Sequence, residues 1–379
     1  MEVNSRLRVL HVLHAYRPGG MENMIAQMAW RLDYDKFEIA ICALTRSDSF
    51  KERLPSGTQI FELNKSPGLS FTCIFNLRKL INKYNPDVVH AHNWDGLIYS
   101  WLALAGTSRV ILQGEHAQLY QWERSKWRLN LRRALYSRCS LVHTVSNGQA
   151  AELTDLGLAK NVDLKVIQNG VDTERFAPVD KDTCRTGFGI SKNAFCLGMV
   201  ARCIADKRHH FLLDAFNELA PDFPELMLVL AGAGGDCEKQ ILGLVKSHPY
   251  KERIHWLGHR NDMPLVYNLF DLFVLPSITE GMSNVCLEAM SSGVAGLVHE
   301  ACGVDEIIQD GYNGFVRAMH TPQDLINSLR ELIPNFAGLK MVGLNARSTA
   351  VKSYPLSRVE RDYADVYRKL AGRSNKLTL

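Results

Sequence analysis

The sequence of 379 residues lacks low-complexity tracts, and it has no apolar run near the roughly 18–20 residues that a membrane-spanning helix needs. Its first residues, MEVNSRLRVLHVLH, have no apolar segment typical of a secretion signal before the first candidate strand. Nine cysteines are scattered from Cys42 to Cys302 without a CxxC pair, which favours reduced thiols over disulfides or a zinc site. We therefore expect a cytoplasmic protein, either soluble or peripheral on the inner face of the membrane.

Motifs for metals, dinucleotides and nucleic acids are also missing. No cluster of His, Cys, Asp and Glu has the spacing of metal ligands. The DYD sequence at 33–35 lies at an expected helix end, and we interpret it as a turn. AGAGGD at 231–236 has Cys237 where a dinucleotide fingerprint needs its third glycine, which argues against an oxidoreductase. No base-stacking or groove-reading motif indicates nucleic acid. We predict that the protein uses no metal and no other cofactor.

Charge is modest but unevenly distributed. The formal net charge is +4, yet residues 1–170 hold 21 Lys and Arg against 15 Asp and Glu, and the remainder holds 23 against 25. A basic amino-terminal half indicates an anionic partner, such as a membrane surface or a charged acceptor. The segment 120–138, YQWERSKWRLNLRRALYSR, has six basic residues and one acid, with Trp and Leu interleaved. Two interpretations stay open: this segment lies on an anionic membrane, or it is a surface helix whose Trp and Leu pack on the sheet while its charges meet water.

Short apolar runs alternate with helical patterns, and the alternation occurs twice along the chain. This predicts two mainly parallel sheets, each covered by helices on both faces. A chain of this length is also longer than a domain built around a single hydrophobic core usually is. We predict an α/β protein of two doubly wound, Rossmann-like domains, at 1–175 and 176–354, and a terminal helix within 355–379. The expected strands are 6–14, 37–45, 87–92, 109–114 and 141–146 in the first domain, and 195–202, 226–232, 253–258, 272–277 and 295–300 in the second.

Ligands of such folds bind at the carboxyl ends of the strands, where this sequence places charged residues and glycine. Arg202 and Lys207 follow one expected strand and suit a pyrophosphate, although a solvated basic loop has the same appearance. SITEGMSNVCLEAMSSG at 277–293 follows another and opens a helix, for which Ser283 is the natural N-cap. The amides at 282–285 then form an anion site.

Two glutamates in the same segment, Glu280 and Glu288, can each accept a pair of hydroxyl hydrogen bonds from a sugar or a ribose. The alternative is a helix-capping glutamate and a solvated one. Together with Arg202 and Lys207, EGMSNVCLEAMSSG resembles the signature of the family-4 retaining glycosyltransferases of the GT-B fold. The similarity extends along the chain through QNGVDTERF, WLGHRNDMP, LFVLPS, NGFV and the final helix. GVAGLV at 293–298 departs from the family pattern, which has a proline in this run.

The resemblance implies two domains that face a central cleft, a final helix that crosses back to the first domain, and a role for each matching residue. Arg202 and Lys207 neutralise the leaving diphosphate, Glu288 binds the donor ribose, and Glu280 holds hydroxyls of the transferred sugar. The remaining donor-binding positions are Gly19 and Gly20 near the distal phosphate, Gly258, His259 and Arg260 at the base, and Gly281, Met282, Ser283, Asn284 and Val285 at the phosphates and sugar.

His116 is implied to lie beside the anomeric centre. A single histidine after a strand is commonly a packing residue, but the position of His116 in QGEHA, at the carboxyl end of a strand, favours the catalytic interpretation. His90 and His92 are weaker candidates, and we expect one of them to pack against the sheet.

The predicted activity is transfer of a sugar, with retention, from a nucleotide sugar to a hydroxyl acceptor, with UDP favoured over GDP. The resemblance to bacterial polysaccharide-assembly enzymes implies a lipid-linked glycan or a surface polysaccharide as acceptor, and a small molecule is the alternative. Three other activities remain open on the same fold: a sugar-nucleotide epimerase, a phosphorylase and a non-catalytic nucleotide-sugar-binding protein.

Overall fold

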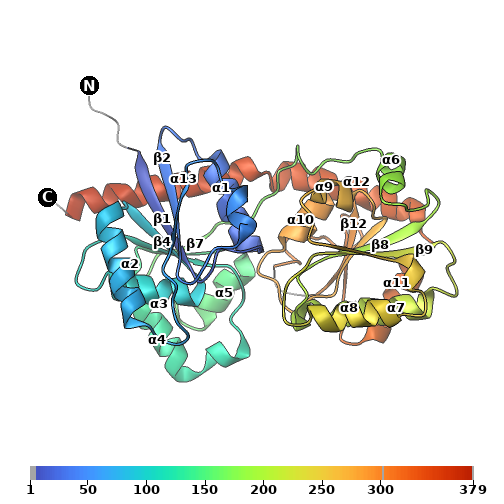
Figure 1. Cartoon of the computed structure of the whole chain (residues 1–379), viewed down its shortest axis with the longest axis horizontal. Helices are drawn as coiled ribbons and strands as arrows, with labels where there is room; N and C mark the ends of the chain where they lie inside the picture. The colour runs from blue at the N-terminus through green and yellow to red at the C-terminus, as the bar shows by residue number, and fades with distance from the viewer. Residues whose placement is uncertain (1–5, 301–302, 378–379) are drawn as a thin grey trace. The chain divides into compact units, whose positions relative to one another are not determined.

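The computed structural model describes residues 6–300 and 303–377, and the chain forms two compact units (Figure 1). The first unit runs to Asn169 and also includes the residues from Ser357 onward, and the second comprises Gly170–Leu356. Each unit contains one sheet whose strands all pair in parallel, with helices between successive strands. The predicted α/β class with two doubly wound units is therefore confirmed.

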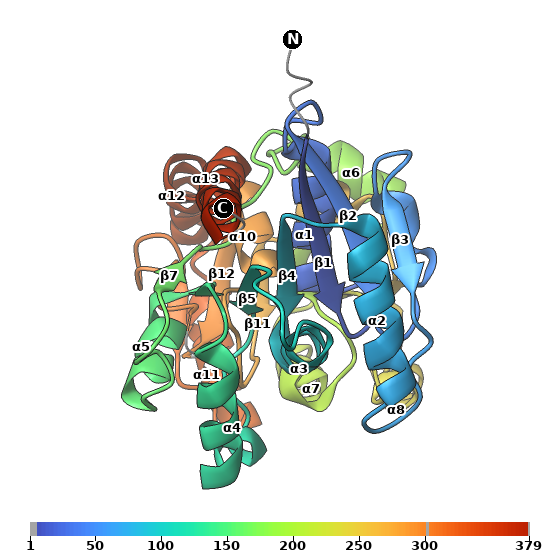
Figure 2. The same ribbon diagram turned by 90° about the vertical axis from the view of Figure 1, so that its left-hand side faces the viewer.

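The first unit has a seven-stranded sheet in the order β3-β2-β1-β4-β5-β6-β7, most of which is visible in Figure 2. The order reverses between β1 and β4, which makes their carboxyl ends the switch point of this sheet. Its elements are β1 (Leu7–Leu13), α1 (Gly20–Arg31), β2 (Phe37–Ala43), β3 (Gln59–Glu62), α2 (Phe71–Tyr84), β4 (Val88–His92), α3 (Asn93–Ala103), β5 (Ile111–Glu115), α4 (Lys126–Tyr136), β6 (Leu141–Thr144), α5 (Asn147–Asp155), β7 (Leu164–Val166) and α13 (Leu356–Leu377).

Alternation along β1 explains how this sheet is covered. Leu10 and Val12 belong to the core shared with α2, α3 and α4. Leu13 packs with residues of α1, and His11 lies edge-on to Tyr367 of α13. Because successive side chains of a strand point to opposite faces, α13 and α1 cover the face opposite to α2 and α3. The terminal helix therefore belongs to the core of the first unit.

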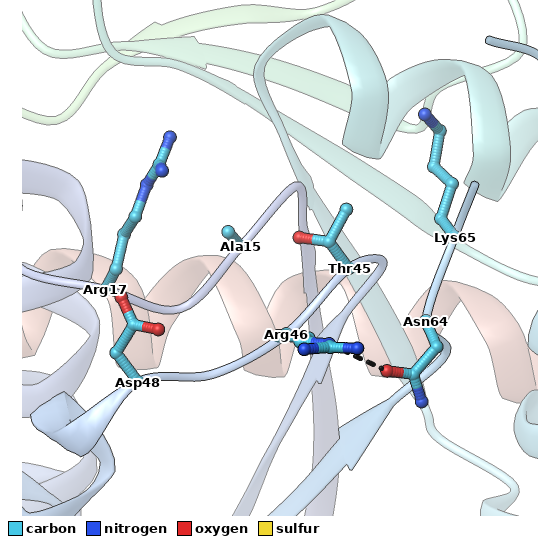
Figure 3. Close-up of a pocket in the computed structure, with 7 residues that line it drawn as sticks. All are labelled: Ala15, Arg17, Thr45, Arg46, Asp48, Asn64 and Lys65. Atoms are coloured by element: carbon cyan, nitrogen blue, oxygen red, sulfur yellow. Dashed lines mark hydrogen bonds between the residues drawn. The ribbon is translucent and has the colours of Figure 1, made fainter. Parts of the chain in front are cut away.

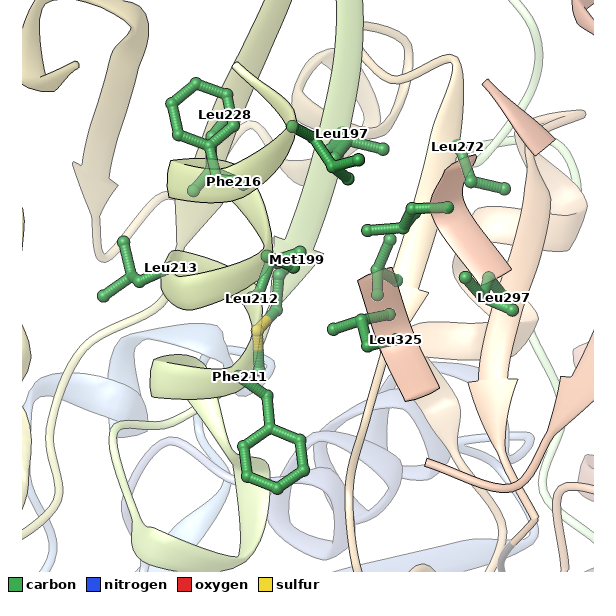
Figure 4. Close-up of a cluster of buried hydrophobic side chains, with 14 of the residues drawn as sticks. Leu197, Met199, Phe211, Leu212, Leu213, Phe216, Leu228, Leu272, Leu297 and Leu325 are labelled. Carbon is green, nitrogen blue, oxygen red and sulfur yellow. The ribbon is translucent and has the colours of Figure 1, made fainter. Parts of the chain in front are cut away.

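The second unit has a six-stranded sheet in the order β10-β9-β8-β11-β12-β13. Its core lies between the sheet and the helices α7 and α11, with Met199, Leu212 and Leu325 among the buried residues (Figure 4). Its elements are α6 (Lys181–Gly187), β8 (Phe195–Val200), α7 (His209–Leu219), β9 (Leu226–Ala231), α8 (Glu238–Ser247), β10 (Ile254–Gly258), α9 (Met263–Tyr267), β11 (Leu272–Leu275), α10 (Asn284–Ser291), β12 (Ala295–His299), β13 (Phe315–Arg317), α11 (Pro322–Leu332) and α12 (Phe336–Ser353).

Three strands were not predicted: β3, β7 and β13. All of them lie at an edge of a sheet and have only three or four residues. None of the three is buried along its whole length, so their sequences lack the continuous apolar run of the central strands. Pairing with a neighbouring strand, rather than local pattern, determines their conformation.

None of the described helices is long and apolar enough to span a membrane. The cysteines among the described residues are free thiols, and most are buried in the two cores. Burial raises the pKa of the Cys203 thiol to about 11, so this thiol stays protonated at neutral pH.

Candidate functional site

Two loops meet at the carboxyl edge of the second sheet. The strands β8 and β11 are neighbours there, and the chain leaves them toward β9 and toward β12, so this is the switch point of the sheet. The loop after β8 contains the 3-10 turn η3 (Ala205–Lys207), and the loop after β11 leads into α10. The amide of Ile278 donates to the carbonyl of Asp206 at 2.9 Å. This bond ties the two loops together.

Lys207 and Glu280 form an ion pair across these loops. Lys207 Nζ donates to Glu280 Oε1 at 2.6 Å, and their side chains are only 17% and 12% exposed. Shielding from water strengthens the attraction, because the effective dielectric constant is lower than in solvent. A lysine ammonium has three donors, so Lys207 retains donors for a second partner. The structure thus brings a fixed cation and a fixed carboxylate together at the switch point.

Glu288 is held by a residue that sequence reasoning missed. The hydroxyl of Tyr267, the last residue of α9, donates to Glu288 Oε2 at 2.7 Å. Burial first, and the Glu288 charge second, raise the pKa of Tyr267 well above its usual value, so the hydroxyl stays a donor. No sequence signal pointed to Tyr267, because it precedes Glu288 by 21 residues on another helix.

The start of α10 has the predicted N-cap. Ser283 has an extended backbone, and its hydroxyl accepts from the amide of Cys286 at 3.4 Å. Gly281, Met282 and Ser283 are buried, and Asn284 and Val285 are partly exposed. Gly303 packs against this turn so closely that a Cβ on it would lie 1.8 Å from the carbonyl oxygen of Gly281. The backbone that precedes α10 is therefore confined by the neighbouring loop.

Arg202 is the member of the predicted cation pair that the structure leaves exposed. Among the described residues it has no recorded ion pair, and it does not join the Lys207–Glu280 contact. Its backbone is nevertheless tightly supported by the glycine loop after β9. A Cβ on Gly232, whose φ is +120°, would lie 2.0 Å from the carbonyl oxygen of Ala201. The AGAGGD segment is thus a turn, as predicted, and its glycines allow close approach to the loop that carries Arg202.

The loop at the end of β10 contains the three residues predicted to contact the base, Gly258, His259 and Arg260, and their environments differ. Gly258 has a φ of +62°, and its carbonyl accepts from the amide of Gly232 at 2.8 Å. His259 is exposed. Arg260 donates through two nitrogens to the carboxylate of Asp262, with Nε to Oδ1 at 2.8 Å. This bidentate pair fixes the guanidinium beside the loop.

In the first unit, Gly19 and Gly20 lie at the start of α1, after β1. Gly19 is the N-cap, with extended backbone and without a side-chain cap, and its carbonyl accepts from the amide of Asn23 at 2.9 Å. A Cβ on Gly19 would meet only the carboxylate of Glu22, at 2.2 Å from Oε2. The space beside this helix end is therefore shared with an acidic side chain.

His116 belongs to a chain of hydrogen-bonded histidines. Its Nε2 lies 2.9 Å from His92 Nδ1, and His92 Nε2 lies 2.9 Å from His11 Nδ1. The His116 amide donates to Asn93 Oδ1 at 3.1 Å, which places the residue at the start of α3. Burial lowers the pKa of His116 to about 4 and that of His11 to about 3, so both are neutral at pH 7. A neutral imidazole has one donor and one acceptor nitrogen, so the tautomer of each histidine determines the tautomer of the histidine to which it is hydrogen-bonded.

We expected one of the two weaker candidates, His90 and His92, to pack against the sheet, but both are buried there. His90 Nε2 lies 2.9 Å from His143 Nε2, and His90 Nδ1 lies 2.9 Å from the hydroxyl of Tyr367. One ring nitrogen each of His11, His90 and His92 lies within 4.8 Å of the others, which is a spacing that can hold a metal ion. Sequence spacing did not reveal this group, because parallel pairing of β1 with β4 creates it.

The structure contradicts part of the second interpretation of the basic segment 120–138, in which its Trp and Leu side chains pack on the sheet. The segment forms the 3-10 turn η2 (Gln121–Arg124) and α4, and Trp122 and Trp127 are 57% and 61% exposed instead of packed on the sheet. The Arg128 guanidinium lies 4.6 Å from the Trp122 ring and 4.8 Å from the Trp127 ring.

One cation of this segment faces inward, which also corrects the first interpretation. Arg132 is 2% exposed, and it pairs with Glu115 at 2.8 Å and with Glu123 at 2.6 Å. A buried arginine with two carboxylate partners is a structural residue, so Arg132 is not available to a membrane.

Comparison with known proteins gives two family models that match successive parts of the chain. The model described as Glycosyltransferase Family 4 matches residues 18–175, and the model described as Glycosyl transferases group 1 matches residues 180–348. The division between the two models falls close to the division between the two units.

Individual relatives match between 79% and 96% of the chain. The UDP-Gal:alpha-D-GlcNAc-diphosphoundecaprenol alpha-1,3-galactosyltransferase of Escherichia coli is 24% identical, over 96% of this chain and 97% of its own length. EpsF of Bacillus subtilis is 28% identical, over 79% of this chain and 80% of its own length. The crystal structure of Anabaena Alr3699/HepE in complex with UDP and glucose superposes with a TM-score of 0.82 at 22% identity, and covers 95% of this chain and 99% of that chain. The fold is thus shared with that protein.

Proposed function

The chain belongs to the family-4 glycosyltransferases of the GT-B fold, and on this basis we propose that it transfers a sugar from a nucleoside diphosphate sugar to a hydroxyl acceptor with retention. The observation that carries the proposal is the Lys207–Glu280 pair at the switch point of the second sheet. A shielded cation beside a carboxylate suits a ligand in which a phosphate adjoins a sugar hydroxyl. Two similar proteins support UDP as the nucleotide, because the Anabaena HepE crystal structure contains UDP and the Escherichia coli galactosyltransferase is named for UDP-Gal.

In the proposed reaction, the bond between the anomeric carbon and the diphosphate oxygen breaks, and its electron pair leaves with the diphosphate. The acceptor oxygen bonds to the anomeric carbon on the same face, and its proton passes to the leaving phosphate. Lys207 and Arg202 stabilise the negative charge that develops, together with the amides at the start of α10. Groups already oriented toward a developing charge commonly supply the largest part of catalysis. We propose that these cations replace a metal ion.

The carboxylates and His116 then orient the sugar. Glu288, aligned by Tyr267, accepts hydroxyl hydrogen bonds from the donor ribose, and Glu280 accepts them from the transferred sugar. His116 is neutral at pH 7 because burial lowers its pKa to about 4. In this proposal, His116 presents that uncharged imidazole beside the anomeric centre. Gly19 and Gly20 face the distal phosphate in this proposal, and Gly258, His259 and Arg260 face the base.

The proposed acceptor is a hydroxyl of a lipid-linked glycan or a growing bacterial surface polysaccharide. Support comes from the relative whose name gives a diphosphoundecaprenol-linked sugar as the acceptor. The exposed Trp122 and Trp127, with the partly exposed Arg128 between them, offer an aromatic and cationic surface for contact with an anionic membrane from the inner side.

A panel of nucleotide sugars tests the donor side of this proposal. Calorimetry measures binding of each nucleotide sugar, and chromatography measures slow hydrolysis to the nucleoside diphosphate and free sugar. We expect one UDP-sugar to bind and to hydrolyse slowly without an acceptor. Binding without any hydrolysis or transfer indicates a binding protein, and conversion to an isomeric nucleotide sugar indicates an epimerase. A requirement for inorganic phosphate indicates a phosphorylase.

A further inference from the structure

The first unit contains a cavity of about 280 Å³ that the proposed donor site does not use. It is bordered by the segments that follow β1, β2 and β3, and Figure 3 shows Arg17 and Lys65 on opposite sides, with Ala15 and Thr45 between them. Arg46, Asp48 and Asn64 complete the lining. The cavity is therefore at the carboxyl edge of the sheet, where doubly wound folds bind ligands.

Backbone hydrogen bonds join the segments that follow β1, β2 and β3 and carry the lining residues of this cavity. The pairing of the three strands continues past their ends, with Thr45 N to His14 O at 2.9 Å, Tyr16 N to Arg46 O at 3.1 Å and Asn64 N to Thr45 O at 3.1 Å. Asn64 has a φ of +50°, a conformation that asparagine adopts more readily than most residues. The cationic side chains thus project from backbone that is already ordered.

The charges that line the cavity are unbalanced. Arg17, Arg46 and Lys65 face a single carboxylate, that of Asp48. Glu62 of β3 accepts from the amide of Ser47 at 2.9 Å, and among the described residues it forms no ion pair with Arg46, although its bonds to Ser47 first and the Lys51 and Arg46 charges after them lower the pKa of Glu62. Arg46 Nε donates only to the neutral Asn64 side chain, at 3.4 Å, and within the described part of the chain none of the three cations has a recorded ion pair. An excess of cationic over acidic side chains in the lining of a concave site favours an anion.

We propose that this cavity binds a phosphoryl group of the acceptor, so that the acceptor is a phosphorylated or diphosphate-linked glycan and not a neutral one. The proposal rests on the proposed transferase function only in naming the ligand as the acceptor. Arginine guanidinium groups hold phosphate oxygens in bidentate fashion, and a lysine adds a point charge. The volume accommodates a phosphate or diphosphate with the beginning of a sugar, which leaves the rest of a larger acceptor outside.

Titration with phenyl phosphate, followed by NMR of backbone amides, tests binding without any turnover. We expect amides of residues 15–17 and 45–48 to shift, and the affinity to fall at least tenfold in Arg17→Ala and Arg46→Ala. Asp48→Asn removes the only acid of the cavity, so it should tighten binding, which a merely damaged fold cannot do. Lys79→Ala removes an exposed cation on α2 and is the matched control. Lys207→Ala removes one of the two cations proposed for the donor site, and we expect it to leave these amide shifts intact.

Equal phenyl phosphate affinity in the wild type, Arg17→Ala and Arg46→Ala overturns the proposal. The proposal is also overturned if the amide shifts are lost in Lys207→Ala and retained in Arg17→Ala and Arg46→Ala, because phenyl phosphate then binds at the donor site. The acceptor is identified by comparing a diphosphate-linked lipid glycan, a soluble sugar phosphate and a neutral alkyl glycoside. A KM that rises in Arg46→Ala only for the phosphorylated acceptors supports the proposal, and the same rise for the neutral glycoside contradicts it. If no nucleotide sugar reacts, the transferase function fails, but the phosphate titration still decides the site.

Discussion

At the scale of single residues, the proposed donor site depends on side chains that hold one another. Lys207 donates to Glu280 at 2.6 Å, and Tyr267 donates to Glu288 at 2.7 Å. Side chains oriented before a ligand arrives lose less conformational freedom on binding. Arg202, in contrast, is exposed and must be ordered by the ligand itself.

The cations should matter most in the transition state. Lys207→Ala removes a charge that stabilises the leaving diphosphate, so we expect kcat to fall by roughly 100-fold or more, which is about 2.7 kcal/mol. Arg202→Ala should have a similar effect. Steady-state turnover with the donor identified above measures both. Lys246→Ala, an exposed lysine on α8, is the control, and Lys207 and Arg202 variants within a few-fold of wild type would contradict these roles.

The two glutamates should separate nucleotide binding from transfer. We expect Glu288→Gln to weaken the binding of UDP alone, and Glu280→Gln to slow transfer while UDP affinity is retained. Tyr267→Phe removes only the bond that aligns Glu288, so UDP affinity should fall less, by about 1 kcal/mol. Calorimetry with UDP provides the measurement. An equal loss of UDP affinity in Glu288→Gln and Glu280→Gln would show that the assigned roles are wrong.

At the scale of elements, η2 and α4 have two chemically different sides. Arg132 points inward to Glu115 and Glu123, while Trp122, Trp127 and Arg128 are at the surface. Two exposed tryptophans that flank an arginine suit the interface of an anionic membrane, where each nearby cation contributes roughly 1 kcal/mol. The helix thus combines a buried ionic anchor with an exposed aromatic surface.

Vesicle co-sedimentation tests this surface. We expect binding to phosphatidylglycerol vesicles at low salt, weaker binding at high salt, and little binding to phosphatidylcholine vesicles, because salt screens the attraction. Trp122→Ala combined with Trp127→Ala and Arg128→Ala should reduce binding at least tenfold. Trp30→Ala removes another exposed tryptophan of the same unit and should change nothing. If the triple variant sediments like the wild type, membrane contact through this segment is excluded.

At the scale of the whole molecule, four buried histidines of the first unit lie between its sheet and α13, namely His11, His90, His92 and His143, and the half-buried His116 is hydrogen-bonded to His92. Burial lowers the pKa of each of them, so the folded protein binds fewer protons than the unfolded chain below about pH 6.5. Their contribution to stability is therefore present above the unfolded pKa and is lost as the pH falls.

We expect the free energy of unfolding of this unit to decrease from about pH 6.5 toward pH 4, by up to about 1.4 kcal/mol per pH unit for each histidine. Urea unfolding followed by tryptophan fluorescence suits the measurement, because five of the six tryptophans belong to this unit. His11→Phe should reduce the pH dependence of the free energy of unfolding by the contribution of one proton. His259→Gln, at an exposed position, should leave that pH dependence unchanged. A free energy of unfolding that stays constant between pH 7 and pH 5 would contradict neutral burial of these rings.

Local sequence patterns determined most of the fold and part of the candidate site. Apolar runs predicted the central strands, because these are buried on both faces and must be apolar throughout. Ser283 was identified as an N-cap because capping involves residues three apart in the chain. The positions of Arg202, Lys207 and Glu280 after strand ends, and of Glu288 within the helix that follows, were equally readable from the sequence.

The tertiary structure alone decided which distant residues meet. Lys207 and Glu280 are 73 residues apart, and His90 and Tyr367 are 277 apart, so their contacts depend on strand order and on the packing of α13. The inward position of Arg132 and the edge strand β3 likewise depend on neighbours that local periodicity does not record. Periodicity and capping describe interactions within a few residues, whereas the sheet register brings together side chains from separate strands, and that is where the proposed site and the basic cavity arise.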